Sequence, residues 1–402
     1  MIPYLLYIFM TLILAIVYDK REDCRAKRAW YRITCLFLIL LAGLRNGVGG
    51  DTLSYMAEYE DAWDSFGNIK EFISDSLINH GRMPLWSMLV VCCHYLSDSF
   101  YLLQFIQAAI VNITIFYIFR QYTQRIFLCA LIYAISGYFF LFCTEVLREG
   151  IAVAMCLIAI QYYLKGSRIQ FALFVLTGIL FHVSATLVLF FPLMQFFHLK
   201  WKSLIWGLLI AFVLWFGSDY IVNQMPAFIE NSQVSIAIKI LKYSDVNSNF
   251  FGFLSNCLRY LCFPFFVMMY TINEEEDDTL RSHKEKLLAF VFFVAILSIG
   301  LNGFARLRNY TEVYYLIALS EFIRMYVRYP KNLFITRTLV ILGVLFYGSL
   351  FYTAYYTSSH RFHYEYYFPY TSVIDSDDCY NFRYEMHEES VNILGNTENT
   401  RK

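Results

Sequence analysis

The stretch that decides the fold runs from residue 100 to residue 119 and reads FYLLQFIQAAIVNITIFYIF. It contains no Asp, Glu, Lys or Arg, and its length meets the roughly 17–25 residues that a helix needs to cross a bilayer. Backbone polar groups inside hydrocarbon must be satisfied within the segment, so this run predicts a helix rather than an open strand. The stretch therefore indicates an all-α membrane protein.

Composition extends this prediction to the whole chain. Of 402 residues, 58% are apolar and only 16% are charged, whereas ordinary soluble domains carry roughly 25% charged residues. Mean hydropathy is +0.48. The formal net charge is zero, which gives no reason to expect a nucleic-acid partner. The ten Cys show no paired spacing, which predicts small core residues rather than disulfides or a zinc site.

Further apolar runs predict about 12 transmembrane helices. These runs are 2–18, 30–44, 100–119, 126–142, 150–164, 169–182, 184–197, 203–217, 253–271, 287–301, 309–323 and 338–357. The first run has no basic segment before it and no small-residue cleavage site after it, so we expect it to be retained as a helix. Pro84–Leu96 is apolar but too short to span, and we interpret it as a re-entrant or interfacial helix on the outer side.

Lys and Arg residues are concentrated in every second connection between these runs. They lie at 20–32, 120–125, 165–168, 200–202, 281–286 and 324–337. The positive-inside rule predicts that these connections are cytoplasmic and that both termini lie outside. The predicted organisation is a polytopic membrane domain over 1–372, with outer loops at about 45–99 and 218–252, and a polar extracytoplasmic tail over 373–402.

Arginines on the predicted outer side are informative, because the positive-inside rule accounts for basic residues only on the cytoplasmic side. The set is Arg45, Arg82, Arg148, Arg306, Arg308 and Arg361. A guanidinium is always charged, and its fork of donors matches phosphate, so the set could bind a lipid-linked pyrophosphate. Alternatively, each could snorkel to headgroups or pair with a carboxylate. Arg259 falls within a predicted span, where it either faces a polar cavity or pairs with a residue such as Glu312.

Two further polar positions lie near predicted helix ends on this side. Asp51 follows a segment with three glycines, which lets the backbone approach a ligand closely or simply makes a flexible exit. His182, followed closely by Ser184, could move a proton or cap a helix. Glu145 and Arg148 are spaced to pair on one helix face, and Glu149 lies beside them.

These residues carry a resemblance to the EpsG family, relatives of the Wzy-type O-antigen and capsule polymerases. The matching marks are Leu44-Arg45 with Val48-Gly49-x-Asp51-Thr52-x-x-Tyr55, Pro84-Leu85-Trp86, Leu147-Arg148-x-x-Ile151-Ala152, Phe181-His182-x-Ser184-Ala185, Arg306-Leu307-x-x-Tyr310 and Tyr367-Phe368-Pro369-Tyr370. The resemblance covers roughly residues 1–375. The chain departs from the family in having Glu149 where Gln is frequent, and Met83 where an acidic residue is frequent.

The resemblance implies a metal-independent glycosyltransferase without a soluble cofactor, similar to multi-span lipid-dependent glycosyltransferases. It would polymerise undecaprenyl-pyrophosphate-linked oligosaccharide repeats, for O-antigen, capsule or exopolysaccharide, at the periplasmic face of the bacterial inner membrane. A chain-length regulator protein is a candidate partner. Arg45, Arg148 and Arg306 would clamp the donor pyrophosphate, and His182 or Asp51 would take the acceptor proton. The further candidates for binding pyrophosphate or glycan are Arg308, Arg82, Arg259, Tyr55 and Tyr310.

Two other functions remain open at this point. An O-antigen ligase would use the same donor, but such ligases carry one dominant outer loop late in the chain, whereas the longest ordered loop expected here comes early. A lipid-linked oligosaccharide flippase would show internal repeats and polar residues at mid-membrane. No repeat is visible, and most polar motifs lie at outer helix ends.

Overall fold

The computed structural model describes residues 2–64, 83–224, 250–273, 275–301, 304–328 and 367–374, together with Arg383 and Glu385. Within these residues all regular structure is helical, apart from a single bridge between Arg45 and Ser372. The prediction of an all-α chain is therefore confirmed for the described part. The predicted span at 338–357 lies outside the described residues.

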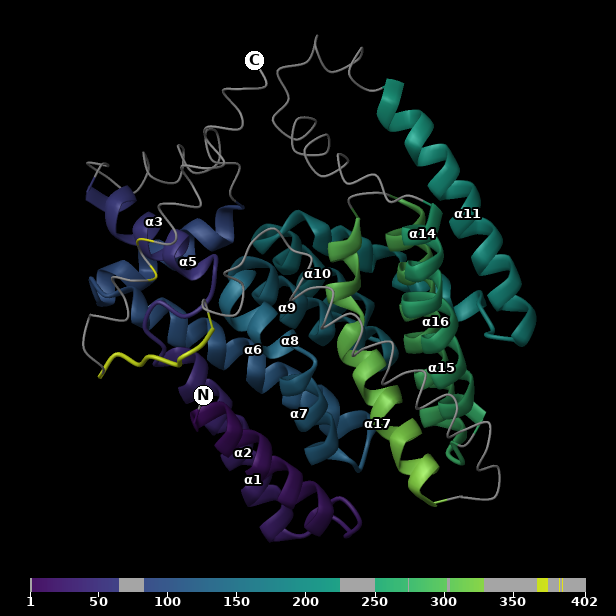
Figure 1. Ribbon diagram of the computed structural model, residues 1–402, viewed down its shortest axis with the longest axis horizontal. Helices are drawn as coiled ribbons and strands as arrows, with labels where there is room; N and C mark the ends of the chain where they lie inside the picture. Colours follow the sequence, from purple (N-terminus) through teal and green to yellow (C-terminus); the bar gives the residue numbers. More distant parts are fainter. Residues whose placement is uncertain are drawn as a thin grey trace.

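The first half of the chain builds a helical bundle in which α2 packs on α6, and α9 packs on both α6 and α10 (Figure 1). Its elements are α1 (Ile2–Tyr18), α2 (Arg25–Gly43), α6 (Phe100–Tyr122), α7 (Ile126–Ile135), α8 (Tyr138–Phe140), the π-helix η1 (Leu141–Glu145), α9 (Leu147–Leu164), α10 (Arg168–Phe181) and the 3-10 helix η2 (Val183–Phe196). Two shorter helices, α3 (Thr52–Asp64) and α5 (Pro84–Leu96), cover one end of this bundle.

The second half adds a group of long helices on the opposite flank, where α11 packs on α16 and α15 packs on α17. Its elements are α11 (Trp201–Gln224), α14 (Phe250–Cys257), the π-helix η3 (Leu258–Cys262), α15 (Phe263–Asn273), α16 (Asp278–Gly300), the 3-10 helix η4 (Ala305–Tyr310) and α17 (Glu312–Arg328).

Glutamines on α6 hold the interior of the first bundle together. The side-chain amide of Gln104 donates to the carbonyls of Gly43 and Arg45, both at 2.9 Å, and that of Gln107 donates to Phe142 at 2.7 Å. Both glutamines are fully buried. Hydrogen bonds of this kind between helices are a common means of association where the surroundings are apolar.

Four described helices are long and apolar enough to cross a membrane, and a bent helix pair raises this number to five. The four cover Phe100–Tyr122, Leu147–Leu164, Trp201–Ser218 and Phe250–Asn273. The expected number of about 12 is not confirmed, because α10 and η2 have only 14 residues each, fewer than the roughly 17 that a span needs. Pro84–Leu96 forms a helix with the predicted bounds.

Two predicted spans differ in shape from a simple α-helix. The run at 126–142 is bent by 77° between Ile126–Ile135 and Tyr138–Glu145. The break between the two parts contains Gly137, whose φ of +84° lies in the left-handed region that only glycine adopts readily. The run at 184–197 forms a 3-10 helix that contains Pro192, a residue that cannot donate to a helical hydrogen bond.

We expect Gly137→Ala to lower the free energy of unfolding by about 1 kcal/mol, because an L side chain is strained at this φ. Steric contact does not contribute, since a Cβ at Gly137 would meet no atom within 4 Å. Gly217 in α11 has equally open surroundings without a positive φ, so Gly217→Ala is a matched control that should be neutral or slightly stabilising. Thermal unfolding in detergent measures both, and equal shifts would contradict the role of the bend.

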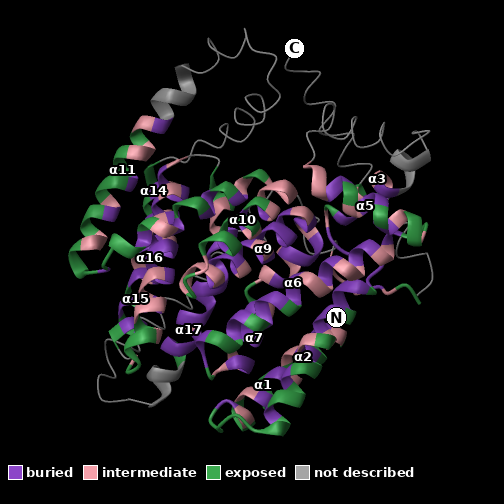
Figure 2. Ribbon diagram, turned by 180° about the vertical axis from the view of Figure 1, so that it is seen from behind, coloured by how far each residue is buried: buried purple, intermediate pink, exposed green. Residues whose placement is uncertain are grey.

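The outer faces of α1 and α11 carry many exposed apolar side chains (Figure 2). On α11 these include Ile205, Trp206, Leu209 and Val213, each at least half exposed. Soluble monomers rarely expose contiguous apolar surface of this kind, whereas a helix that faces lipid needs it. The exposed faces therefore support membrane insertion of the helices that carry them.

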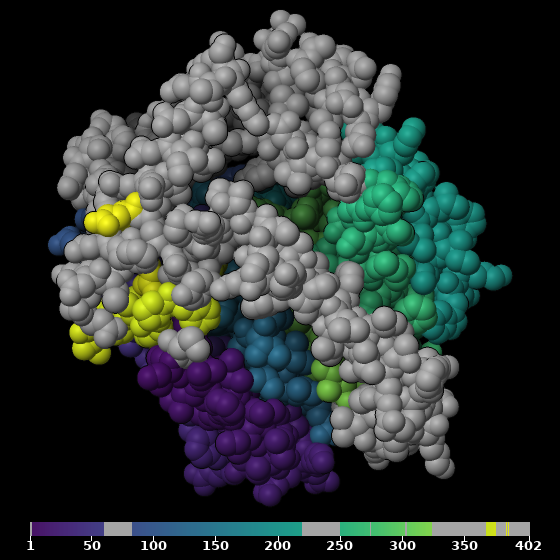
Figure 3. Space-filling view, in the orientation of Figure 1, coloured from purple at the N-terminus to yellow at the C-terminus, as the bar shows by residue number. Residues whose placement is uncertain are grey.

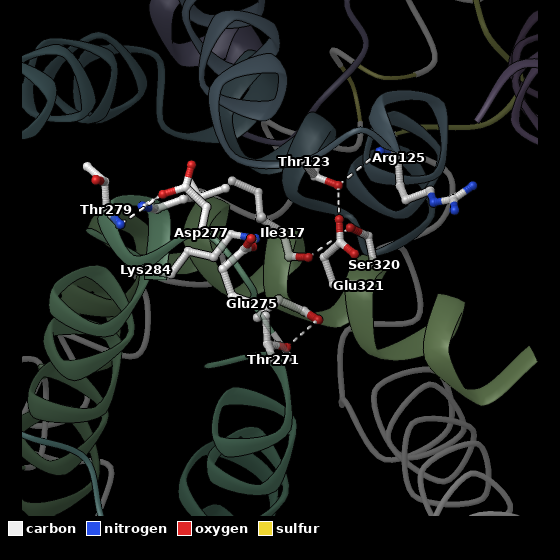
Figure 4. A network of polar contacts seen from close by, with 12 residues as sticks. Thr123, Arg125, Thr271, Glu275, Asp277, Thr279, Lys284, Ile317, Ser320 and Glu321 are labelled. Carbon is white, nitrogen blue, oxygen red and sulfur yellow. Dashed lines mark hydrogen bonds and ion pairs between the residues drawn. The ribbon is translucent and has the colours of Figure 1, made fainter. Parts of the chain in front are cut away.

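Polar contacts join the helices at the end where the basic connections lie (Figure 4). The Thr123 hydroxyl donates to Glu321, and Lys284 pairs with Glu275 at 2.5 Å. The Asp277 carboxylate caps α16 by accepting from the backbone N–H groups of Thr279 and Leu280. The connections at 120–125 and 275–286, two of the six that carry the predicted basic residues, therefore lie at the same end of the packed helices.

Candidate functional site

The loop after α2 is held by a buried arginine. Arg45 is 1% exposed, and its guanidinium donates to the carbonyls of Ala42 and Val48 and to the Thr52 hydroxyl. Its Nε–Val48 and Nη2–Thr52 distances are 3.1 and 3.4 Å. Since Arg45 uses these donors within the chain, we interpret it as a support for the loop that carries Asp51, in place of the expected contact with pyrophosphate.

The same loop is fixed from the other side by Glu145. Its carboxylate accepts from the backbone N–H groups of Gly50 at 2.8 Å and Asp51 at 3.2 Å. Gly49 makes this approach possible, because its φ is +111° and a Cβ there would lie 2.7 Å from the Thr144 side chain. The glycine-rich segment is therefore a shaped turn that presents Asp51, rather than a flexible exit.

The C-terminal segment 367–374 completes this anchor, and it lies beside the N-terminal residues in Figure 3. The Tyr367 hydroxyl donates to Glu145 at 2.6 Å, and Tyr4 packs edge-on against Phe368 with ring centroids 5.4 Å apart. Arg383 is 1% exposed and donates to the carbonyls of Asn46 and Pro369 and to Thr371. Part of the predicted polar tail is therefore folded against the loop.

A cluster of polar side chains forms where α9, η4 and the α10–η2 junction meet. The Asn309 amide donates to Glu149 at 3.1 Å, and the Tyr310 hydroxyl lies 3.4 Å from Nδ1 of His182. The Arg148 guanidinium lies over the Tyr55 ring at 5.9 Å from its centroid. The motifs around residues 55, 148, 182 and 310, far apart in sequence, are therefore brought together.

Asp51 and Arg306 are connected to this cluster by charge interactions that shift pKa values. Partial burial raises the pKa of Asp51 above its ordinary value, and Glu145 raises it further, while Arg306 and Arg148 oppose this shift. Burial lowers the pKa of His182 to about 4, and the positive charges of Arg148 and Arg306 lower it further. His182 is therefore neutral at pH 7, and both arginines act on both titratable groups.

Two buried atoms in the cluster have no hydrogen-bond partner, namely Nε of Arg148 and Oε2 of Glu149. Glu149 is 2% exposed. Unpaired polar atoms are costly away from water and tend to mark functional positions. The cluster therefore combines positive charge, a neutral imidazole and carboxylates with unused hydrogen-bonding capacity.

Arg259 and Arg308 form a separate group around Tyr260. The Arg308 and Arg259 guanidinium carbons lie 3.3 and 4.5 Å from the Tyr260 ring centroid. Glu312, which is 8% exposed, is the carboxylate that both arginines influence. Arg259 lies in the π-helix η3, a distortion frequently found at functional sites. Glu312, the expected partner of Arg259, is therefore within its electrostatic influence, but no ion pair joins the two among the described residues.

Sequence reasoning missed the anchoring contacts around the cluster. The predicted pairing of Glu145 with Arg148 is wrong, because η1 ends at Glu145 and α9 begins at Leu147, and no ion pair joins the two side chains in the described residues. Asn309 and Arg383 carried no recognisable signal in the sequence. Arg82 and Arg361 lie outside the described residues, which also contain no group of three potential metal ligands.

Residues 28–372 match the EpsG family. The chain belongs to the EpsG family. No curated protein and no solved structure matches it. For this EpsG-family protein, the matched segment contains Asp51, Arg148, His182 and Arg306, so the cluster lies within the family region. Family membership, together with the long apolar helices, indicates an integral membrane protein with a role in polysaccharide biosynthesis.

Proposed function

We propose that this protein is a polymerase that joins undecaprenyl-pyrophosphate-linked oligosaccharide repeat units into a surface polysaccharide. The observation that carries the proposal is that the positive charges of Arg148 and Arg306 both act on the pKa values of Asp51 and His182. Two guanidinium groups beside a carboxylate and a neutral imidazole suit a reaction in which a diphosphate departs and a hydroxyl loses its proton.

In the proposed reaction, the acceptor hydroxyl oxygen attacks the anomeric carbon of the donor sugar. The bond from this carbon to the pyrophosphate oxygen breaks, and undecaprenyl pyrophosphate leaves with the bonding electrons. Arg148 and Arg306 stabilise the negative charge that develops on the leaving group. Asp51 or His182 takes the acceptor proton.

A polymerase must also hold a second lipid-linked unit as the acceptor. Arg259 and Arg308 are the remaining charged groups that we assign to this task, because they gather on Tyr260 and are partly accessible. Tyr55 contributes its ring to the first cluster beside Arg148, whereas Tyr310 is fully buried and supports His182 through its hydroxyl. Aromatic rings beside charged groups suit the apolar faces and hydroxyls of sugars.

The proposed reaction takes place at the periplasmic face of the inner membrane. Internal contacts mark two different ends of the packed helices: Lys27 donates to Gln124 among the basic connections, whereas Gly50 donates to Glu145 beside the cluster. The positive-inside rule assigns the basic end to the cytoplasm. The fuller topology, with about 12 spans and Pro84–Leu96 as an interfacial or re-entrant helix, belongs to the same proposal.

Deletion of the gene for this protein distinguishes a polymerase from the alternative functions. In the deletion strain, we expect the final acceptor to carry single repeat units only. Expression of the wild-type protein should restore the ladder, that is, the series of polysaccharides of increasing length. Polysaccharide separated by length on a gel measures this. A complete absence of repeats on the acceptor would instead indicate a ligase, and accumulation of lipid-linked units on the cytoplasmic side would indicate a flippase.

A further inference from the structure

A basic cavity of about 390 Å³ lies at the end opposite the proposed reaction site. It is bounded by the α1–α2 connection, the first two turns of α2 and the α6–α7 turn, at the lower end of the molecule in Figure 1. Its size falls within the roughly 300–1,000 Å³ of small-molecule sites. None of its lining residues contributes to the cluster around Asp51.

The walls of this cavity are fixed by buried polar contacts. Lys27 is 3% exposed, and its Nζ donates to the carbonyls of Arg21 and Gln124, both at 3.0 Å. The Asp19 carboxylate accepts from the backbone N–H groups of Phe127 at 3.2 Å and Leu128 at 2.9 Å. The α1–α2 connection is therefore held against the α6–α7 turn, and the cavity between them is a built feature.

The lining carries more positive than negative charge. Its basic members are Arg21, Lys27, Arg28, Arg32 and Arg120, and its acidic members are Glu22 and Asp23. Asp23 is shared by Arg28 at 3.1 Å and Arg120 at 3.6 Å. Among the described residues, no carboxylate lies within ion-pair distance of Arg21 or Arg32. The excess charge suits a phosphate group.

An apolar stripe on α2 begins beside this cavity. Trp30, Ile33, Leu36 and Leu40 recur on one face of the helix and are 39–51% exposed. A soluble phosphate compound would make no use of this stripe, whereas the acyl chains of a lipid would lie along it. Basic pockets between membrane helices on the cytoplasmic side suit anionic headgroups.

We propose that the cavity binds the headgroup phosphate of an anionic phospholipid from the cytoplasmic leaflet, with the acyl chains along Trp30, Ile33 and Leu36. Arg21 and Arg32 contact the phosphate, and Lys27 keeps the cavity open by bridging its two walls. The bound lipid then fixes the α1–α2 hairpin against α6 and α7. Arg21 and Arg32 recognise the phosphate ester, and the apolar stripe makes the site bind the lipid-borne form more tightly than a soluble ester.

Native mass spectrometry of the purified full chain tests this, with dioleoyl phosphatidylglycerol and dioleoyl phosphatidylcholine as probes. We expect the wild-type chain to retain phosphatidylglycerol preferentially. The double variant Arg21→Gln/Arg32→Gln should bind it roughly 30-fold more weakly, since each basic residue contributes roughly fivefold to anionic lipid binding. Lys200→Gln/Lys202→Gln removes two exposed charges from the same end and should retain the lipid.

Equal retention of the two lipids by the wild-type chain would overturn the proposal, as would equal loss of phosphatidylglycerol in both double variants. Glycerol phosphate, added at the same concentration as the lipid, distinguishes the two sources of phosphate. Displacement of the lipid by glycerol phosphate would reject the lipid as ligand and leave a site for free phosphate esters, whereas retention supports the lipid. Thermal unfolding of both double variants without added lipid checks that each is folded.

Discussion

Arg148→Ala and Arg306→Ala should each reduce the rate of polymer formation by roughly 10²–10³-fold, the loss typical of a missing donor to developing negative charge. Both guanidinium groups act on Asp51 and His182, and the proposed mechanism has the departing pyrophosphate develop its charge beside them. In cells, either change should replace the long-chain ladder by single repeats while the protein still inserts. Gel separation of the polysaccharide measures this result.

Lysine substitutions test whether the positive charge alone is sufficient or whether the planar guanidinium is required. Arg148→Lys and Arg306→Lys keep the charge but lose the planar fork, so they should recover only part of the activity. Arg168→Ala is a matched control, because Arg168 is exposed at the basic end of the molecule and should leave the ladder unchanged. Normal ladders from Arg148→Ala and Arg306→Ala would refute the clamp.

The sequence predicted the helical class well, because long apolar runs permit only helices within a bilayer. Phe100–Tyr122 and Leu147–Leu164 appear close to the predicted positions. The shapes of individual helices were harder to predict. The bend after Ile135 depends on the backbone conformation of one glycine, and a hydropathy pattern does not encode φ. The same pattern does not distinguish an α-helix from the 3-10 helix at Val183–Phe196.

The sequence motifs do not indicate what each side chain contacts. Arg148 and Arg306 lie near enough to Asp51 and His182 to shift the pKa values of both groups, and the functional roles of these four residues are proposals. Arg45 was assigned to pyrophosphate, yet its donors bond to backbone carbonyls. The charge of Arg45 and its position in the sequence do not reveal that its donors are hydrogen-bonded within the protein. These hydrogen bonds depend on how the loop turns back on the helix end.

Asp51→Asn should lower the rate of polymer formation by roughly 10²–10⁴-fold, the range typical of a lost general base. We favour Asp51 over His182 because it is exposed at the surface of the cluster and its raised pKa makes it a stronger base than an ordinary carboxylate. The pKa of His182 is lowered to about 4 by burial and by the two arginines, so its basicity is weak. Glu58→Gln, in helix α3 that begins directly after Asp51, serves as the control for charge removal.

The pH profile separates the two candidates further. A base must be unprotonated, so with Asp51 in this role the activity should fall as pH decreases through a pKa above the ordinary value of roughly 3.9. This acid limb should disappear from the residual activity of Asp51→Asn and persist in His182→Asn. His182 would be the base if His182→Asn abolished activity while Asp51→Asn kept both most of the rate and the acid limb. Initial rates across a pH series with a lipid-linked donor measure these profiles.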